Sequence, residues 1–171
     1  DEFDRSFLTL YPDVAIVTSM DADHLDIYGD RSHLVESFRQ FVSQIKEGGR
    51  LIFKKGLDLS GGKTYSANVL ADIQAVNVKV QDGSFYFDFK NENIVIENIQ
   101  LGLPGLHNIE NAVAAIAVAL HLGIDPEKIK KALASFLGVK RRFEYILKDQ
   151  KHIYIDDYAH HPEELRACIS S

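Results

Sequence analysis

The sequence predicts an α/β fold in which a parallel sheet with flanking helices carries a small antiparallel meander. Three observations predict it: a strand–helix–strand pattern near the start, alternating strands in the middle, and two well-delimited helices after them. The chain has 171 residues, of which 46% are hydrophobic. It is therefore long enough to bury a core and to form one domain or slightly more.

The first unit is a strand, a helix and a second strand. Residues 14–18, VAIVT, form a continuous apolar run of the kind that is buried on both faces of a sheet. Residues 32–46 carry apolar side chains at helical spacing, and Gly48 and Gly49 end the pattern. Residues 50–54 form the second strand. Because a helix joins the two strands, we expect them to pair in parallel.

The middle of the chain predicts an antiparallel meander. The segments VNVKV (residues 76–80) and FYFDF (residues 85–89) alternate apolar and polar side chains on either side of an Asp-Gly turn. A third strand follows at residues 94–96. The alternation predicts that the valines and phenylalanines face the core while the opposite face meets water.

Two helices and a hairpin complete the pattern. The first helix is expected over residues 108–122, closed by Gly123, and the second over residues 126–137, with Asp125 as its N-cap and Pro126 at its first position. Short strands at 143–147 and 152–155 then lead to a final helix that Pro162 starts, and acidic residues in its first turn suit the helix dipole.

The segment GLDLSGGKT, at residues 56–64, resembles a phosphate-binding loop but fails on spacing. Such a loop needs four residues between its first glycine and the Gly-Lys pair, and this segment has five. No clear amphipathic helix follows it that could receive a phosphate at its N-terminus. We therefore predict a solvent-exposed glycine turn.

Composition excludes several classes of protein. A net charge of −6 argues against a protein that coats nucleic acid, because phosphate binding requires a basic face. The single cysteine, Cys168, excludes an internal disulfide and is compatible with a reducing compartment. No apolar run approaches the length of a membrane span, and no signal peptide pattern opens the chain. We expect a cytoplasmic protein without nucleic-acid or membrane partners.

The segment GLPGLHNIENAVAAIA, from Gly102, carries the main candidate site. A glycine-proline turn runs into an alanine-rich helix whose first turn contains His107, Asn108 and Asn111. Amide side chains offer donors and acceptors in one plane, which suits the edge of adenine, and the two asparagines share a helix face. The alternative is that Asn108 only caps the helix.

The segment TSMDADHLDIYGD, at residues 18–30, follows the first buried strand, where parallel sheets bind ligands. His24 and the aspartates around it form a patch that can hold a divalent ion. Mg²⁺ prefers oxygen ligands, so His24 would be one ligand among few. The alternative is an acidic loop whose carboxylates cap a helix.

Two later segments add charged candidates. The basic run in GVKRRFEYI ends at Arg142, whose planar guanidinium suits a transferring phosphate, although such a run is also typical of a solvated turn. In IDDYAHHP, Asp157 can accept hydrogen bonds from ribose hydroxyls. We expect His160 and His161 to point to different sides and to make a poor metal pair by themselves.

Taken in order, these segments resemble the Mur ligase family. The resemblance rests on DEFDRSF, VAIVTSMDADHLDIYGD, GLHNIENAVAAIAVA, GVKRRF and DDYAHHPEE, in that order and spacing. It runs from end to end and is weakest over residues 65–100. Within the family, the chain is most similar to the branch that adds alanine.

The resemblance implies a three-domain cytoplasmic enzyme of peptidoglycan synthesis. Such an enzyme uses ATP and Mg²⁺ to turn the carboxylate of UDP-N-acetylmuramate into an acyl phosphate, which the amine of L-alanine attacks. It implies that His24 holds magnesium and that His24 and Arg142 act in catalysis. The nucleotide-binding residues that it implies are Asn108 and Asn111 at the adenine, Asp157 at the ribose and Arg142 at the phosphates, together with His107, which lies in the same motif as the asparagines.

The chain also departs from the family pattern. The family's phosphate loop and its metal-binding glutamate would lie upstream of Asp1, and sister ligases carry a carbamylated lysine near the position of Arg39. The alanine-adding branch resembles this chain in lacking that lysine. The resemblance therefore predicts that residues 1–139 are the later part of a central ATP-binding domain and that residues 140–171 are a linker and the beginning of a C-terminal domain. We expect the missing N-terminal and C-terminal domains to be its partners and the chain alone to be inactive.

Three alternatives stay open. A murein-peptide recycling ligase shares the reaction but takes a tripeptide, although DADH after the first strand resembles the alanine-adding branch more closely. A non-catalytic nucleotide- or metal-binding module would explain the missing phosphate loop. A metal hydrolase built on His24, His160, His161 and nearby aspartates would bind zinc or manganese tightly.

Overall fold

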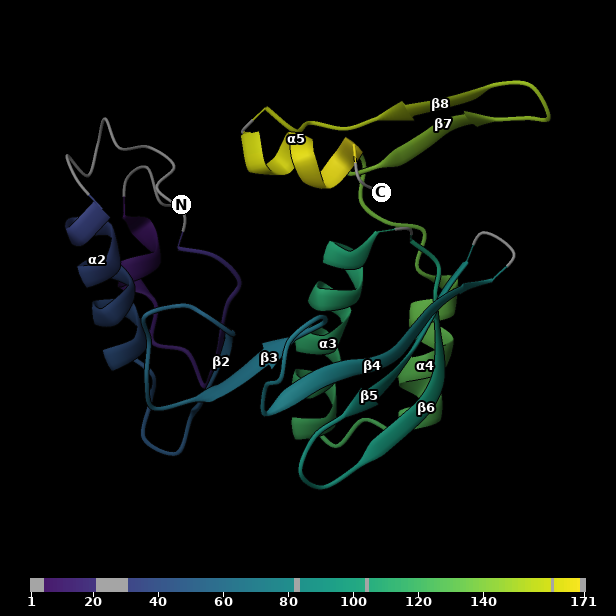
Figure 1. The fold of residues 1–171 in the computed structure, drawn as a ribbon. Helices are drawn as coiled ribbons and strands as arrows, with labels where there is room; N and C mark the ends of the chain where they lie inside the picture. Colours follow the sequence, from purple (N-terminus) through teal and green to yellow (C-terminus); the bar gives the residue numbers. More distant parts are fainter. Residues whose placement is uncertain (1–4, 21–30, 82–83, 104, 161, 170–171) are drawn as a thin grey trace.

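The computed structural model describes residues 5–20, 31–81, 84–103, 105–160 and 162–169 (Figure 1). The strands are β1 (Val14–Val17), β2 (Arg50–Lys54), β3 (Lys63–Ser66), β4 (Ile73–Gln81), β5 (Ser84–Lys90), β6 (Val95–Leu101), β7 (Glu144–Lys148) and β8 (Ile153–Asp156). The helices are the 3-10 helix η1 (Ser6–Thr9) and the α-helices α2 (Arg31–Ser43), α3 (Leu106–His121), α4 (Pro126–Ser135) and α5 (Pro162–Ile169).

Strands β1 to β6 form one six-stranded sheet in chain order. The pairs from β1 to β4 are parallel and the pairs from β4 to β6 are antiparallel, so β4 joins the parallel part to the meander. The predicted α/β class is confirmed. The prediction of a glycine turn over residues 56–64 was wrong at its end, because Lys63 and Thr64 begin β3 and pair with Ile52 and Phe53.

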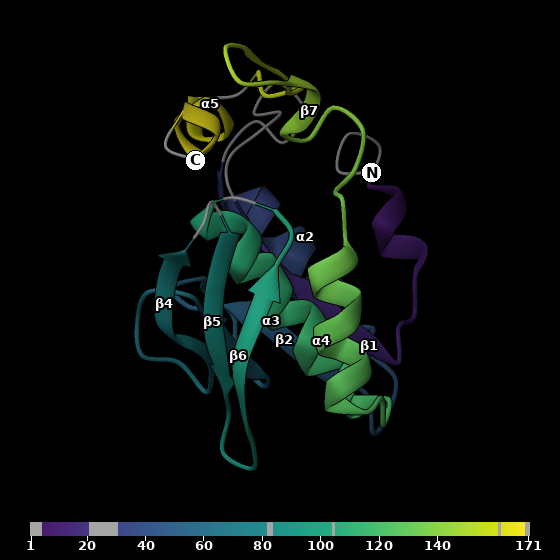
Figure 2. The same ribbon diagram turned by 90° about the vertical axis from the view of Figure 1, so that its right-hand side faces the viewer.

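Helix α3 fixes the larger of two apolar cores. Its side chains Ile109, Val113 and Ile116 are almost fully buried and belong to one cluster with Phe87 and Phe89 of the meander. Helix α4 lies beside α3 and contacts β6 (Figure 2). The small alanine side chains of α3 allow this close packing. Because the apolar stripe of α3 is buried against the sheet, it determines which face of the helix points away from the sheet.

A second core lies around β1 and β2. It joins Ala15 and Val17 to Leu34 and Phe38 of α2, and it is separate from the cluster around α3. The prediction that β1 is buried on both faces was wrong, because Ile16 is 38% exposed. Helix α2 packs on one face of the strand, and alternate side chains of a strand point to opposite faces.

The predicted alternation in β4 was also wrong in phase. Ala75 is buried and pairs with Phe89, so these two side chains share the core face, whereas Val80 is 63% exposed. The even-numbered valines therefore begin on the opposite face. A register shift between Val76 and Lys79 follows, where Asn77 has a φ of 54°. The prediction for β5 is confirmed, because Phe87 and Phe89 are buried.

Both predicted helices after the meander exist, with different bounds. Helix α3 begins at Leu106 with Gly105 as its N-cap, so the capping role considered for Asn108 was wrong. Asn108 instead lies in the first turn, where its backbone N–H donates to the carbonyl of Gly105 at 3.1 Å. Asp125 caps α4 as predicted, and its side chain accepts hydrogen bonds from the backbone of Glu127 and Lys128.

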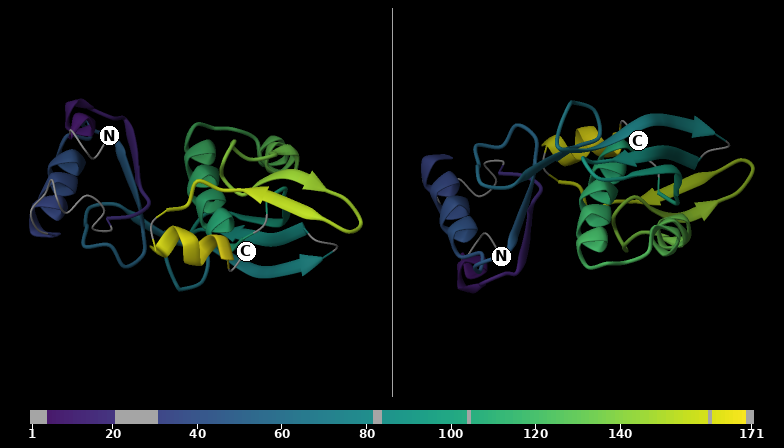
Figure 3. Two further views of the ribbon diagram at one scale, coloured as in Figure 1. Left: turned by 90° about the horizontal axis from the view of Figure 1, so that it is seen from above. Right: turned by 90° about the horizontal axis from the view of Figure 1, so that it is seen from below.

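Strands β7 and β8 form a separate antiparallel hairpin. The hairpin and α5 lie beyond the N-terminal end of α3, across from the six-stranded sheet (Figures 1 and 3). This placement brings the start of β7 and the end of β8 near the N-terminal end of α3 (Figure 1). Within the described residues, no helix has both the length and the apolar character needed to cross a bilayer.

The N-cap of α4 yields a stability prediction. Replacing Asp125 with alanine removes two hydrogen bonds to helix N–H groups at 2.9 and 3.3 Å, and we expect a loss of about 1 kcal/mol in the free energy of unfolding. Urea denaturation measures it. Asp125→Asn is the matched control, since asparagine caps equally well and should lose little; equal losses in both variants would contradict the capping role.

Candidate nucleotide site

A cavity of about 510 Å³ lies between α3, α4 and the segment that contains β7, β8 and α5. Five of the six site residues predicted from the sequence line it: His107, Asn108, Asn111, Arg142 and Asp157. They come from three stretches of the chain that are distant in sequence. The sixth, His24, lies outside the described residues. The volume is within the range of small-molecule sites in proteins.

The amides reach this cavity because of the way α3 is packed. Ile109 and Val113 are fully buried on the sheet side of the helix. Asn108 is half-buried, Asn111 is exposed, and both line the cavity with Ala112. Residues three apart share a helix face, so the two amides lie together, as the sequence predicted.

The other walls are mostly apolar. They come from β6 and the residue stretch after it, from α4, and from the residues between α4 and β7, namely Leu101, Leu103, Leu133, Phe136, Val139 and Phe143. Apolar walls with a small number of polar groups are typical of a site for a flat heterocycle, because the walls desolvate its faces while amides select its edge. No sequence motif indicates these wall residues, because apolar side chains at such positions are common in any α/β fold.

Asp157 is held in place by backbone donors. Its Oδ2 accepts a hydrogen bond from the N–H of Phe143 at 2.7 Å, and its Oδ1 accepts one from the N–H of Ala159 at 2.7 Å. The N–H of Tyr158 also donates to the carbonyl of Arg141 at 2.8 Å. Each carboxylate oxygen has a second lone pair, so Asp157 can still accept a hydroxyl donor from the cavity.

Arg142 is the residue of the basic run that lines the cavity. Its Nη1 lies 3.2 Å from Oε1 of Glu164, and its neighbours Arg141 and Phe143 both have positive φ, at 59° and 50°. Positive φ is uncommon outside glycine and marks a backbone that its surroundings hold in place. Arg141 instead makes a long contact of 3.9 Å to Asp156.

Glu164 completes this wall of the cavity. One of its oxygens meets Arg142 and the other accepts the backbone N–H of His160 at 3.2 Å. From the sequence, Glu164 is only one of the acidic residues in the first turn of the final helix, where they suit the helix dipole. Its part in the site depends on the position of α5, which no local pattern indicates.

Burial controls the protonation of two groups in the cavity. It lowers the pKa of His107, while the charges of Asp157 and Glu110 act weakly in the opposite direction. His107 is therefore a neutral imidazole near pH 7. Burial, with a smaller contribution from Asp157, raises the pKa of the Cys168 thiol, so this group stays protonated and is a poor nucleophile.

Among the described residues, no group of three or more His, Cys, Asp or Glu side chains is arranged to hold a metal ion. His160 is exposed and its Nδ1 lies 3.1 Å from the carbonyl oxygen of Tyr158. His24 and the aspartates around it, like His161, lie outside the described part. Arg39, which stands near the position of the carbamylated lysine in sister ligases, forms an ion pair with Asp58 at 2.6 Å.

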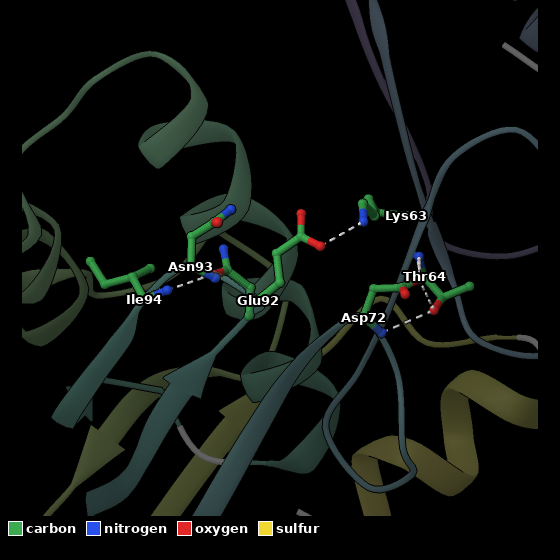
Figure 4. Close-up of polar contacts among 7 residues, drawn as sticks. Lys63, Thr64, Asp72, Glu92, Asn93 and Ile94 are labelled. Carbon is green, nitrogen blue, oxygen red and sulfur yellow. Dashed lines mark hydrogen bonds and ion pairs between the residues drawn. The ribbon is translucent and has the colours of Figure 1, made fainter.

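A second cavity, of about 600 Å³, lies at the opposite end of α3, and Gly61, Gly62 and Lys63 of the rejected phosphate-loop segment line it. There Lys63 points toward Glu92 and pairs with it at 3.1 Å, as Figure 4 shows. Asp72 accepts hydrogen bonds from the N–H and hydroxyl of Thr64, which lower its pKa. Lys63 is thus paired with a carboxylate of this chain. This agrees with the spacing of the segment, which does not match a phosphate-binding loop.

A family model described as the Mur ligase middle domain matches residues 2–119. The chain belongs to the Mur ligase family. It is 48% identical over 167 residues to the UDP-N-acetylmuramate–L-alanine ligase of Christiangramia forsetii, covering 98% of this chain and 37% of that protein. It is 49% identical, with the same coverage, to the enzyme of that name from Flavobacterium psychrophilum. The chain thus spans about 37% of the length of these relatives.

The fold is also that of solved Mur ligases. The structure of the UDP-N-acetylmuramate-alanine ligase MurC from Thermotoga maritima matches with a TM-score of 0.83 and 25% identity, covering 99% of this chain and 37% of that one. The family resemblance found in the motifs is thereby confirmed. The match includes the hairpin and α5 beyond the family model, so it covers every segment that lines the first cavity.

The buried His107 predicts a pH effect on stability. Because its pKa is lowered in the folded chain, the unfolded chain binds more protons below about pH 6.5, and folding loses free energy as the pH falls through that value. His107→Gln lacks this contribution. Urea denaturation at pH 7.5 and 5.5 should show a larger loss for the wild type than for the variant, and equal losses would contradict the assignment.

Proposed function

We propose that this chain is part of an ATP-dependent ligase of peptidoglycan synthesis that joins L-alanine to UDP-N-acetylmuramate through an acyl-phosphate intermediate. The observation that carries the proposal is the first cavity, which gathers two amides, an arginine and a carboxylate from α3 and from both ends of the hairpin. The activity named for relatives at 48% and 49% identity supports the choice of substrates.

Each residue has a role that its chemistry suits. Asn108 and Asn111 hydrogen-bond the edge of adenine, while the apolar walls cover its faces. Asp157 accepts hydrogen bonds from the ribose hydroxyls, and His107 supplies a neutral imidazole beside them. Arg142 binds the phosphates and neutralises the charge that develops as the γ-phosphoryl group moves to the muramate carboxylate.

We also propose that His24 holds the magnesium ion that ATP requires. This assignment rests on the motif resemblance, because the residue lies outside the described part of the structure. The metal would neutralise phosphate charge when bound, and His24 would keep it at the carboxyl end of β1. We expect the chain to bind Mg²⁺ weakly by itself. Micromolar zinc affinity in a titration would favour the metal hydrolase instead.

The division of the chain follows from the same proposal. Residues 1–139 are the later part of the central ATP-binding domain, and residues 140–171 are the linker and the beginning of the C-terminal domain. The separate hairpin sheet supports this boundary. We propose that the chain alone is inactive, that it works with the remaining domains of the same protein, and that the reaction takes place in the cytoplasm, which the single cysteine suits.

The direct test is a ligation assay with the intact protein that contains this chain. Purified protein is supplied with ATP, Mg²⁺ and UDP-N-acetylmuramate together with single amino acids or a tripeptide, and ADP and the ligated product are measured. We expect product with L-alanine. Transfer of a tripeptide would favour the recycling ligase, and nucleotide binding without ATP consumption would favour a non-catalytic module.

The amide at position 111 yields a quantitative prediction. Asn111→Ala in the intact protein should raise KM for ATP about tenfold, because a paired amide contact to adenine is worth about 1–3 kcal/mol. Asn93→Ala, at an exposed position in the second cavity, is the matched control and should leave KM unchanged. An unchanged KM in Asn111→Ala would remove this residue from the site.

A further inference from the structure

The two apolar cores of the chain meet at strand β2. Leu51 and Phe53 belong to the core around α2, whereas Ile52 belongs to the core around α3. Alternate residues of a strand point to opposite faces, so β2 turns one face to each core. Lys54 is the last residue of the strand. Because it comes two residues after Ile52, its side chain lies on the same face as Ile52, which is the face toward α3.

Lys54 forms an ion pair across this junction. Its Nζ lies 2.7 Å from Oε2 of Glu110, near the N-terminal end of α3. The Glu110 side chain is 14% exposed, while that of Lys54 is 43% exposed. Because the Glu110 side chain is mostly covered, salt screens this ion pair less than it screens a fully exposed pair. The ion pair therefore links β2, which contributes side chains to both cores, to helix α3.

Both ends of this ion pair lie next to parts of the proposed nucleotide site. Glu110 stands between Asn108 and Asn111 in the sequence of the α3 turn that carries the amides. On the other side, Phe53 pairs with Val17, the last residue of β1. Lys54 therefore lies next to the carboxyl end of β1, from which the sequence continues toward His24. The helix that carries the amides thus belongs to the core around α3, and the carboxyl end of β1 belongs to the core around α2.

We propose that the Lys54–Glu110 ion pair is a positioning pair, which sets the N-terminal part of α3 and its amides relative to the carboxyl ends of β1 and β2 so that one nucleotide reaches both. This inference rests on the proposed function. Neither side chain lines the first cavity, so the pair acts through Asn108 and Asn111 and not by touching the nucleotide. Sequence motifs do not indicate it, because Lys54 and Glu110 are 56 positions apart in the chain.

The test compares variants of the intact protein by steady-state kinetics. Lys54→Met and Glu110→Gln should each raise KM for ATP about tenfold and leave KM for L-alanine unchanged. This is less than the about hundredfold loss that a misplacement of about 1 Å can cause. Lys54→Arg keeps a cation at the same place and should restore KM for ATP to near the wild-type value.

A matched control removes a lysine from another ion pair. Lys63→Met breaks the exposed pair with Glu92 at the opposite end of α3 and should not change KM for ATP. Thermal unfolding is measured for every variant. A lower Tm with an unchanged KM for ATP in Lys54→Met and Glu110→Gln means that the pair is only structural and overturns the proposal, as does an equal rise of KM in Lys63→Met.

Direct ATP binding separates this inference from the proposed function. If the wild-type protein does not ligate alanine, the proposed function fails, and the Kd for ATP of the same variants still decides the positioning role. A Kd about tenfold weaker in Lys54→Met and Glu110→Gln supports it, and an unchanged Kd overturns it. A wild-type protein that binds no ATP overturns both.

Discussion

The packing of the apolar stripe of α3 against the sheet is the interaction on which the candidate site depends. Ile109, Val113 and Ile116 are buried with the phenylalanines of β5, and this burial fixes the rotation of the helix about its axis. Asn108 and Asn111 then face the cavity as a geometric consequence. The core that stabilises the chain thus also sets the helix face on which the amides lie.

Contacts between the residues before β7 and the residues after β8 orient the carboxylate of Asp157 and the guanidinium of Arg142. Asp157 receives the N–H groups of Phe143 and Ala159, and Glu164 joins Arg142 to the segment after β8. The hairpin and α5 thus act together as one wall of the cavity. A chain that lacked this wall would keep the amides but lose the arginine and the carboxylate, which come from beyond α4.

Local patterns predicted the elements well and their environments less well. The Asp125 cap and the alternation in FYFDF each depend on neighbouring residues, and both predictions were confirmed. Strand β3 was missed because its four residues follow a glycine-rich segment and show no alternation. The valines of β4 were assigned to the wrong face because only the pairing of Ala75 with Phe89 sets the phase. Glu164 and the Lys54–Glu110 pair depend on tertiary placement, which no local pattern contains.

Photolabelling the intact protein with 8-azido-ATP, followed by peptide mapping, tests the central claim most directly, because the azide reacts where the purine lies. The account predicts label on peptides that contain the first turn of α3 or the wall residues Phe136 and Phe143, and loss of that label when excess ATP competes. Label confined to peptides of the second cavity, or spread over the surface without competition by ATP, would contradict it.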